Sequence, residues 1–353
     1  MKFLPVVFAV TASLTSGCRL HTADFSLLRV APDTALDSPQ KAFDEVRRLR
    51  DSGQVARDRR IVVEFACGTY AVGKPIEISA EHGPLLIKGA GRLGTVFSGG
   101  KRLGLFRVET NGRVWRTPAA ADWDFDQLFI NRKRAEPSSP DKCLSPWVPG
   151  AWYRDAATHE VVYVARPGEN PTGTTAIAGA VGTVMVLRGA VDVTVEGVSF
   201  MHNAGGPVVV CDGAKGLLFS DCGFRHCAGY GLKVAGKSCD VAIRHCRFDD
   251  AGDGAVTAFG VDGLVFEDNV VSDCGSTAEQ AAVRIEGGRR CRVVHNDFCS
   301  LRCGGVLCAG EGCESGMNRF WKVPGEKDSP RDGEAGVSDK DPVWRARAEL
   351  LTF

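Results

Sequence analysis

One pattern of apolar and polar positions recurs five times between Val193 and Cys308. Each copy has two apolar residues at alternate positions, a small residue or Asn, a Phe or Val, a Gly-rich turn and two more alternating apolar residues. The copies align on five anchor residues, Phe200, Phe224, Phe248, Val271 and Phe298. The spacings of 24, 24, 23 and 27 residues between these anchors are typical of a solenoid made of short strands.

The positions around the anchors keep the same order in every copy. Five residues before the anchors stand Val195, Phe219, Ile243, Phe266 and Val293. Seven residues before them stand Val193, Leu217, Val241, Leu264 and Cys291. Eight and ten residues after them stand Val208 and Val210, Leu232 and Val234, Val256 and Ala258, and Val306 and Cys308, while Val283 and Ile285 come four places late in the fourth copy. This alternation predicts strands that stack in parallel, and hence an all-β chain folded as a right-handed parallel β-helix solenoid.

A further column supports stacked coils. Two residues before the anchors stand Val198, Cys222, Cys246, Asn269 and Asn296. Stacked Asn side chains at a bend can hydrogen-bond to the backbone of the neighbouring coil, and a small Cys fills the same corner without a polar cost. Fourteen cysteines in an exported chain would ordinarily suggest disulfides. The repeat instead predicts that those at inward positions are buried thiols: Cys222, Cys246, Cys291 and Cys308.

The N-terminus resembles a bacterial secretory signal. Lys2 precedes an apolar run over residues 3–14, and Thr15-Ser16-Gly17-Cys18 follows. Small residues before a Cys are similar to a lipobox, which would lipidate Cys18, although Thr15 departs from the usual aliphatic residue. Ordinary cleavage near this point is the alternative. Either way we expect the mature chain in the bacterial cell envelope, as a periplasmic or surface lipoprotein, or secreted.

The remaining chain divides into five predicted segments. We expect a linker over 19–37, a capping helix and first coils over 38–100, a small inserted β-domain over 101–179, regular coils over 180–321 and a polar tail over 322–353. Ser38 is a suitable helix N-cap before Pro39, and Gly53 ends the predicted helix. The insertion is inferred because the period is lost between Gly99 and Gly179.

Composition restricts the partners. The chain has 44% apolar residues and equal numbers, 43 each, of acidic and basic residues. This balance, without a basic run, does not favour nucleic acid. The chain shows no nucleotide or redox cofactor motif, no CxxC pair and only scattered histidines, so we expect no cofactor and no metal. We expect a monomer that meets a membrane only through a lipid anchor.

Five short motifs follow one another along the first 170 residues of the chain. They are Gly68-Thr69-Tyr70, Ser98-Gly99-Gly100, Val114-Trp115-Arg116, the run 127–134 with sequence QLFINRKR, and Val161-Val162-Tyr163-Val164 before Pro167-Gly168-Glu169. Over residues 40–320 this order resembles bacterial β-helix proteins of the pectate-lyase-like superfold, including β-xylosidase-like glycoside hydrolases with an inserted small β-domain. The resemblance implies a polysaccharide or oligosaccharide ligand. The run 135–139 departs from the family's Ala-Arg-Tyr-Pro-like turn, so we expect an altered contact between the domains.

Candidate catalytic carboxylates lie at one edge of the coils. Asp253 precedes the inward Val256 by three residues, and polygalacturonase-like β-helices carry a catalytic Asp at a comparable place. Glu279 lies one coil further, within the insertion 276–280. Carboxylates on adjacent coils could stand about 5 to 9 Å apart, as glycoside cleavage requires. Asp250 and Asp273 are the next candidates, and the alternative for all four is an ordinary role in turns.

Two other groups of residues are candidates for substrate binding. The column two residues after the anchors contains His202, His226, Asp250, Asp273 and Ser300. Stacked at about 4.8 Å, these groups would shift one another's pKa values and form a proton-transfer or sugar-binding ridge, or else a charge-paired surface ladder. Arg284 and Glu286 are expected to project outward near Phe259, whose ring suits a sugar.

Three functions are compatible with the sequence. The first is a glycoside hydrolase that uses paired carboxylates on the solenoid face. The second is a non-catalytic, shortened carbohydrate-binding or structural β-helix, because the repeat stops after Trp321. The third is a polysaccharide lyase, which needs clustered acids for Ca²⁺ and a basic residue. Asp249, Asp250 and Asp253 with Arg247 are the only approximation to that arrangement.

Overall fold

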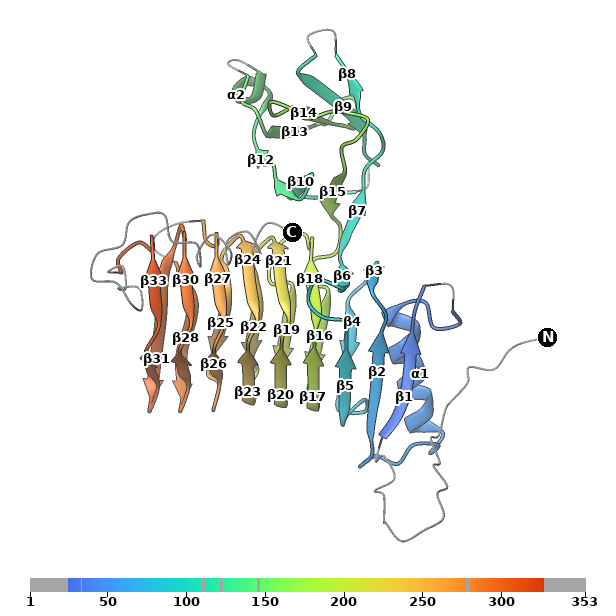
Figure 1. Ribbon diagram of the computed structural model, residues 1–353, viewed down its shortest axis with the longest axis vertical. Coiled ribbons are helices and arrows are strands. Elements are labelled where there is room, and N and C mark those ends of the chain that lie inside the picture. The colour runs from blue at the N-terminus through green and yellow to red at the C-terminus, as the bar shows by residue number, and fades with distance from the viewer. Residues whose placement is uncertain are drawn as a thin grey trace, which may run out of the picture.

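The computed structural model describes residues 25–32, 34–109, 112–120, 123–144, 147–276 and 280–326 of the 353-residue chain. They form a row of stacked coils and a smaller β-domain that stands on one edge of that row (Figure 1). The predicted signal segment, including Cys18, lies outside the described residues. Among these residues no helix has the length and apolar character needed to cross a bilayer.

The described strands of the coils form three parallel sheets, and Figure 1 shows their strands stacked coil upon coil. The nine-stranded sheet contains β1 (Phe25–Val30), β2 (Arg60–Phe65), β5 (Leu85–Lys88), β17 (Val191–Glu196), β20 (Lys215–Ser220), β23 (Cys239–Arg244), β26 (Val265–Glu267), β29 (Arg292–Val294) and β32 (Glu314–Gly316). The eight-stranded sheet contains β3 (Gly68–Ala71), β6 (Thr95–Ser98), β18 (Val198–Met201), β21 (Gly223–Cys227), β24 (Arg247–Ala251), β27 (Val270–Ser272), β30 (Asp297–Cys299) and β33 (Arg319–Trp321). The seven-stranded sheet contains β4 (Ile76–Ile78), β16 (Met185–Arg188), β19 (Val209–Asp212), β22 (Tyr230–Ala235), β25 (Gly254–Phe259), β28 (Ala281–Arg289) and β31 (Gly304–Glu311).

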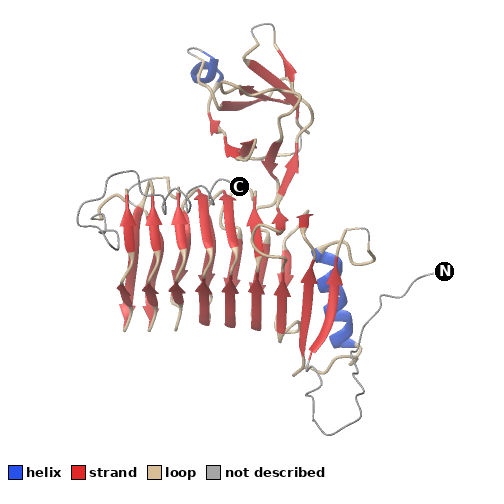
Figure 2. Ribbon diagram, viewed as in Figure 1, coloured by secondary structure: helices blue, strands red, loops and turns tan. Residues whose placement is uncertain are grey.

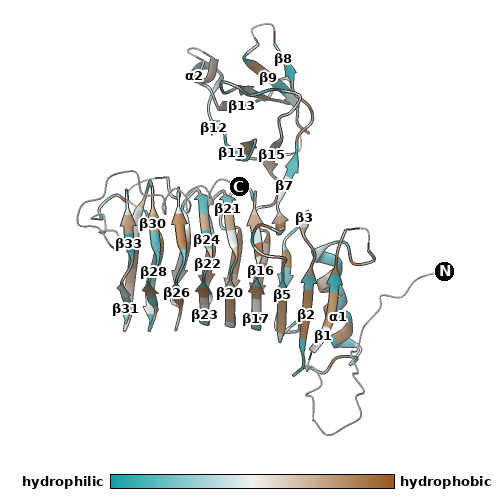
Figure 3. Ribbon diagram, viewed as in Figure 1, coloured by the Kyte–Doolittle hydropathy of each residue, from teal (hydrophilic) through white to brown (hydrophobic). Residues whose placement is uncertain are grey.

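The predicted anchors stack in register along the eight-stranded sheet. Phe200 pairs with Phe224, Phe224 with Phe248, Phe248 with Val271 and Val271 with Phe298. All five are buried. The rings of Phe224 and Phe248 stack with centroids 4.6 Å apart. The column therefore forms a continuous aromatic and apolar spine. Figure 3 shows hydrophobic and hydrophilic residues within the same strands of the coils.

The prediction for the first copy is wrong by one residue. Val209 and Cys211, rather than Val208 and Val210, align with the inward pair of the next coil. Between the paired positions Phe200 and Val209 the chain has one more residue than between Phe224 and Leu232 of the next coil. Because side chains alternate between the faces of a strand, a slip of one residue exchanges inward and outward positions, and Val210 is accordingly only partly buried. In the fourth copy the late pair does align with the preceding coil, as predicted.

The Asn column forms hydrogen bonds along the solenoid axis. The side-chain oxygen of Asn269 accepts the backbone N–H of Cys246 at 2.9 Å, and that of Asn296 accepts the N–H of Asn269 at 2.9 Å. Asn318 extends the series by accepting the N–H of Asn296 at 3.0 Å. Asn269 and Asn296 are buried, so these bonds satisfy polar groups that water cannot reach. The predicted structural role of this column is confirmed.

One helix packs at the N-terminal end of the coils (Figure 2). Helix α1 spans Pro39–Asp51, and Ser38 Oγ accepts the N–H of Lys41 at 3.5 Å. Phe43 and Val46 of this helix share the hydrophobic core of the first coils. Strand β1 (Phe25–Val30) lies within the range expected to be a linker and pairs with β2, so that part of the range is a strand of the nine-stranded sheet.

The inserted domain leaves the coils after β6 and returns before β16 (Figure 1). Its described strands form a five-stranded sheet of β12 (Glu136–Pro137), β13 (Ala151–Asp155), β14 (Glu160–Val164), β9 (Val114–Pro118) and β8 (Arg107–Val108). A four-stranded sheet contains β11 (Lys133–Arg134), β10 (Leu128–Ile130), β15 (Ala176–Gly179) and β7 (Gly100–Arg102). A short helix, α2, spans Pro140–Leu144. Trp115 and Tyr163 belong to a core separate from that of the coils.

The thirteen described cysteines are free thiols. Cys222, Cys246 and Cys291 are buried, as their inward positions predict, and Cys308 is only partly buried in β31, at the end of the seven-stranded sheet. Within the predicted tail, Val323 packs into the core. The tail beyond residue 326 lies outside the described residues.

Candidate functional site

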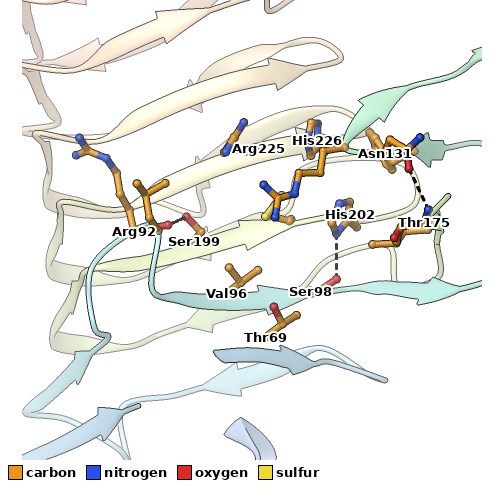
Figure 4. A pocket seen from close by; sticks show the side chains of 15 residues that line it. Thr69, Arg92, Val96, Ser98, Asn131, Thr175, Ser199, His202, Arg225 and His226 are labelled. Carbon is orange, nitrogen blue, oxygen red and sulfur yellow. Dashed lines mark hydrogen bonds between the residues drawn. The ribbon is translucent and has the colours of Figure 1, made fainter. Parts of the chain in front are cut away.

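A cavity of about 730 Å³ lies between the eight-stranded sheet and the inserted domain (Figure 4). Its volume falls within the range of about 300–1,000 Å³ usual for ligand sites. The coils contribute Thr69, Arg92, Leu93, Val96, Ser98, Ser199, Met201, His202, Arg225 and His226. The inserted domain contributes Phe129, Asn131, Arg132, Thr175 and Ile177.

The predicted polar column lies at the C-terminal ends of strands of the eight-stranded sheet, either among the last residues of the strand or directly after it. All of its members have φ between 51° and 59°: His202, His226, Asp250, Asp273 and Ser300. This left-handed region is uncommon for residues other than Gly, although His and Asp adopt it more readily than most. The repeated conformation places one polar side chain per coil along the edge where the inserted domain docks.

The two histidines are buried beneath the inserted domain. His202 and His226 are 7% and 4% exposed, and their rings stack with centroids 5.5 Å apart. Phe129 packs against both rings at 5.1 and 4.9 Å. Ser98 Oγ accepts the N–H of Gly100 at 3.3 Å and lies 3.1 Å from His202 Nδ1, so the hydroxyl can donate to the ring. The histidines are therefore part of an interdomain contact and not of an exposed ladder.

Burial has a large effect on His202. Desolvation, reinforced by the nearby His226, Arg225 and Arg134, lowers the pKa of His202 to about 3. The ring is therefore neutral at physiological pH. His202 therefore adds no charge to the wall of the cavity.

Asp250 joins the coils to the inserted domain. Arg134 Nε donates to Asp250 Oδ1 at 2.9 Å, and His226 Nδ1 lies 2.8 Å from Asp250 Oδ2. Burial favours the neutral acid, but the hydrogen bond from His226 and the charge of Arg134 outweigh it and lower the pKa of Asp250. An ionised carboxylate only accepts, so His226 Nδ1 is the donor. The buried His226 Nε2 has no hydrogen-bond partner among the described residues.

Asp273 has the opposite environment one coil further along. Desolvation of its carboxyl and the negative charges of Asp249 and Asp250 raise the pKa of Asp273, although the residue as a whole is exposed. Asp249 accepts hydrogen bonds from Arg225 at 3.1 Å and from Ser272 at 2.9 Å. Neighbouring coils thus carry one carboxyl whose pKa is lowered and another whose pKa is raised.

Of the pair preferred from the sequence, Asp253 and Glu279, the structure describes only Asp253. Glu279 lies outside the described residues. Gln280 Nε2 lies 3.5 Å from Asp253 Oδ1. Burial and the nearby Asp253 raise the pKa of Tyr230 to about 12.

The remaining binding candidates lie on the seven-stranded sheet. Arg284 Nε donates to Glu286 Oε1 at 2.8 Å, and its guanidinium lies 5.9 Å from the centre of the Phe259 ring. Phe259 is 43% exposed. Arg284 also borders a second cavity, of about 340 Å³. The structure thus brings these three together, but on a different sheet from the histidine column.

The acids considered for a Ca²⁺ site make separate contacts. Asp249 pairs with Arg225, Asp250 with Arg134, and Asp253 lies beside Gln280. Within the described part of the chain, no three His, Cys, Asp or Glu side chains are arranged to hold a metal ion.

Several cavity residues were not singled out from the sequence. Phe129, Asn131, Arg132 and Arg134 lie within the run 127–134, which was noted only as a family motif. Arg225 occupies the outward position directly beside Asp249 on the next coil, and this pairing could have been found from the repeat alignment.

Comparisons with known proteins support the same fold. The model of the right-handed β-helix region matches residues 175–320. No curated protein sequence matches the chain. A structure described as a glycoside hydrolase is 13% identical, with a TM-score of 0.59, over 84% of this chain and 96% of that one. The structure of XylC with xylose is 14% identical, with a TM-score of 0.63, over 83% of this chain and 62% of that one. The match and the strand register show that the chain is a right-handed parallel β-helix protein.

Proposed function

We propose that the chain is an exported carbohydrate-active protein, and specifically a glycoside hydrolase that acts at the edge of the coils beside the inserted domain. The observation that carries the proposal is the pair of carboxyls on adjacent coils, Asp250 and Asp273, whose environments move their pKa values in opposite directions. Such a division is typical of sites that need one ionised carboxylate and one protonated acid. The likeness of the fold to a glycoside hydrolase and to XylC, which was solved in complex with xylose, agrees with this chemistry.

Each carboxyl has a role that follows from its surroundings. Asp273 keeps its proton to a higher pH than an ordinary aspartate and is exposed, so it is suited to protonate a leaving-group oxygen. Asp250 remains ionised and is suited to stabilise developing positive charge on the sugar ring. Asp249 adds negative charge near Asp273. Asp253 remains a further candidate carboxylate, and Glu279, which lies outside the described residues, remains one from the sequence.

The test is hydrolysis of plant and algal polysaccharides and aryl glycosides by the purified chain, with Asp250→Asn, Asp273→Asn, Asp253→Asn and Glu279→Gln variants. Asp268→Asn is the matched control. Asp268 has the same left-handed backbone but is exposed, and it precedes strand β27, whereas Asp273 follows that strand. We expect Asp273→Asn and Asp250→Asn to lose hydrolysis of polysaccharides while remaining folded. Undiminished activity in both variants would move the chemistry elsewhere.

A second function, glycan binding without cleavage, is favoured by one observation. The described residues that line the large cavity include no Asp or Glu. A chain that binds a saccharide tightly but cleaves no member of the panel would support this function.

Export, with lipidation at Cys18, is proposed from the N-terminal sequence and is tested by globomycin sensitivity and by metabolic labelling with a fatty-acid analogue.

A further inference from the structure

We propose that the large cavity selects an acidic sugar, namely a uronic-acid residue of the saccharide, through the guanidinium groups of Arg92, Arg132 and Arg225. The proposal rests on the carbohydrate ligand proposed above and specifies its chemical class.

The charged side chains that line the cavity have one sign. Three arginines face it, and its described lining contains no carboxylate. Arg92 pairs with Asp221 at 2.6 Å, and Arg225 pairs with Asp249 at 3.1 Å. These two acids lie outside the lining and offset part of the charge.

Arg132 is the arginine of the lining whose positive charge neither of these two acids offsets. It lies at the turn between β10 and β11 with φ of 63°, is exposed, and forms no ion pair with the described residues. An arginine in this position can offer two parallel N–H donors to a carboxylate, and such charge-assisted pairs are about twice as strong as neutral hydrogen bonds. A neutral sugar gains no such contact.

The rest of the lining suits a pyranose ring. Val96, Met201 and Ile177 offer apolar contacts, while the hydroxyls of Thr69 and Thr175 are available beside them. Asn131 is held in place because its Oδ1 accepts the N–H of Thr175 at 3.0 Å. An apolar wall with a few convergent polar groups is the usual composition of a small-molecule site.

The charge of the cavity does not depend on its histidine at position 202. Desolvation lowers the pKa of His202 to about 3, so the ring is neutral over the range in which uronic acids are ionised. His226, Asp250 and Arg134 pack around it and form their own contacts. Arg225 connects the two parts of the site, because it lines the cavity and also contacts Asp249, which lies near Asp273.

The test is calorimetric titration of the full chain carrying Asp273→Asn, which keeps the saccharide intact. The probes are trimers of galacturonate, glucuronate and mannuronate, with xylotriose as the neutral comparison. We expect at least one uronate trimer to bind about tenfold more tightly than xylotriose, with an affinity that falls as salt rises. Arg132→Gln should weaken that binding about fivefold or more. Lys133→Gln, which removes a charge from the neighbouring residue outside the cavity, should leave it within about twofold.

Equal or tighter binding of xylotriose, unchanged affinity in Arg132→Gln, or no binding of any uronate trimer would overturn the inference. Hydrolysis by the wild-type chain distinguishes a failure of this inference from a failure of the proposed function. Cleavage of neutral saccharides with no uronate preference would leave the hydrolase standing and remove the inference. Selective uronate binding without any cleavage would do the reverse.

Discussion

Arg134 of the inserted domain reaches across to Asp250 of the coils, with Nε donating to Oδ1 at 2.9 Å. A second nitrogen of the same guanidinium donates to the backbone carbonyls of Cys227 at 2.9 Å and of Asp250 at 2.7 Å. One side chain thus binds two neighbouring coils and fixes the position of the inserted domain over the cavity. The planar group matches this set of acceptors in a way that an ammonium group cannot.

Arg134→Ala should destabilise the chain by about 3 kcal/mol, because it leaves the largely buried Asp250 carboxylate with one partner fewer. Arg134→Lys should recover less than half of the loss, since it cannot donate in the same fork. Chemical denaturation followed by tryptophan fluorescence measures both. The exposed neighbour Lys133→Ala should change stability by less than about 0.5 kcal/mol. Equal effects at the two positions would show that the Arg134 contacts do not hold the domains together.

Acid should destabilise the fold through His202. Its folded pKa of about 3 is below the unfolded value of about 6.5, so the neutral ring contributes stability that is complete above pH 6.5 and is lost as the pH falls toward 3. His202→Asn should flatten the dependence of the unfolding free energy between pH 7 and pH 5. His245→Asn, at an exposed position with the same left-handed backbone, should leave the slope unchanged. An unaltered slope in His202→Asn, or a His202 ring that titrates near pH 6.5 by NMR, would contradict this expectation.

The Asn column should be least tolerant of substitution in its buried part. Asn296 Nδ2 donates to the carbonyls of Phe266 and Val294, both at 2.9 Å, and its Oδ1 accepts from Asn269. Asn296→Ala removes these hydrogen bonds from buried backbone groups and should cost about 3 kcal/mol. Asn318→Ala, at the end of the column and only partly buried, should cost about 1 kcal/mol. Equilibrium denaturation checks the order, and equal losses would mean that the bonds along the axis contribute little.

The sequence was most informative where a structural constraint repeats in every coil. Phe224 and Phe248 must both fill the interior at the same level of successive coils, so their spacing alone predicts their contact. The Asn column was predictable for the same reason. The strand at Val209 was misplaced because a single extra turn residue leaves the hydrophobic content unchanged while exchanging the two faces of the strand.

The candidate site was only partly predictable. The column that contains His226 and Asp250 was found from the repeat, and the structure places these two residues in contact at 2.8 Å. Their burial was not foreseen, because it depends on Phe129 and Arg134, which come from a domain without the repeat. A contact between residues 116 positions apart has no periodic signal to reveal it.

If Asp273 is the acid of the proposed reaction, the rate should depend on its protonation. Its pKa is raised above the ordinary value of 3.8, so the protonated and active form persists to a higher pH and is lost as the pH rises through the raised pKa. The rate of polysaccharide cleavage should therefore fall on the alkaline side. Asp273→Asn should lose this dependence together with most of the rate, which a pH profile of both chains measures.

The most direct test compares wild-type and Asp273→Asn chains on a cleaved polysaccharide and on an aryl glycoside with an activated leaving group. Loss of a general acid should slow polysaccharide cleavage by about 10²–10⁴-fold and spare the aryl glycoside, which needs little protonation. The predicted result is that selective loss, in a variant whose unfolding midpoint is unchanged, with Asp268→Asn as active as the wild type. Equal rates of polysaccharide cleavage by wild-type and Asp273→Asn chains would contradict the assignment of the acid at this edge of the β-helix.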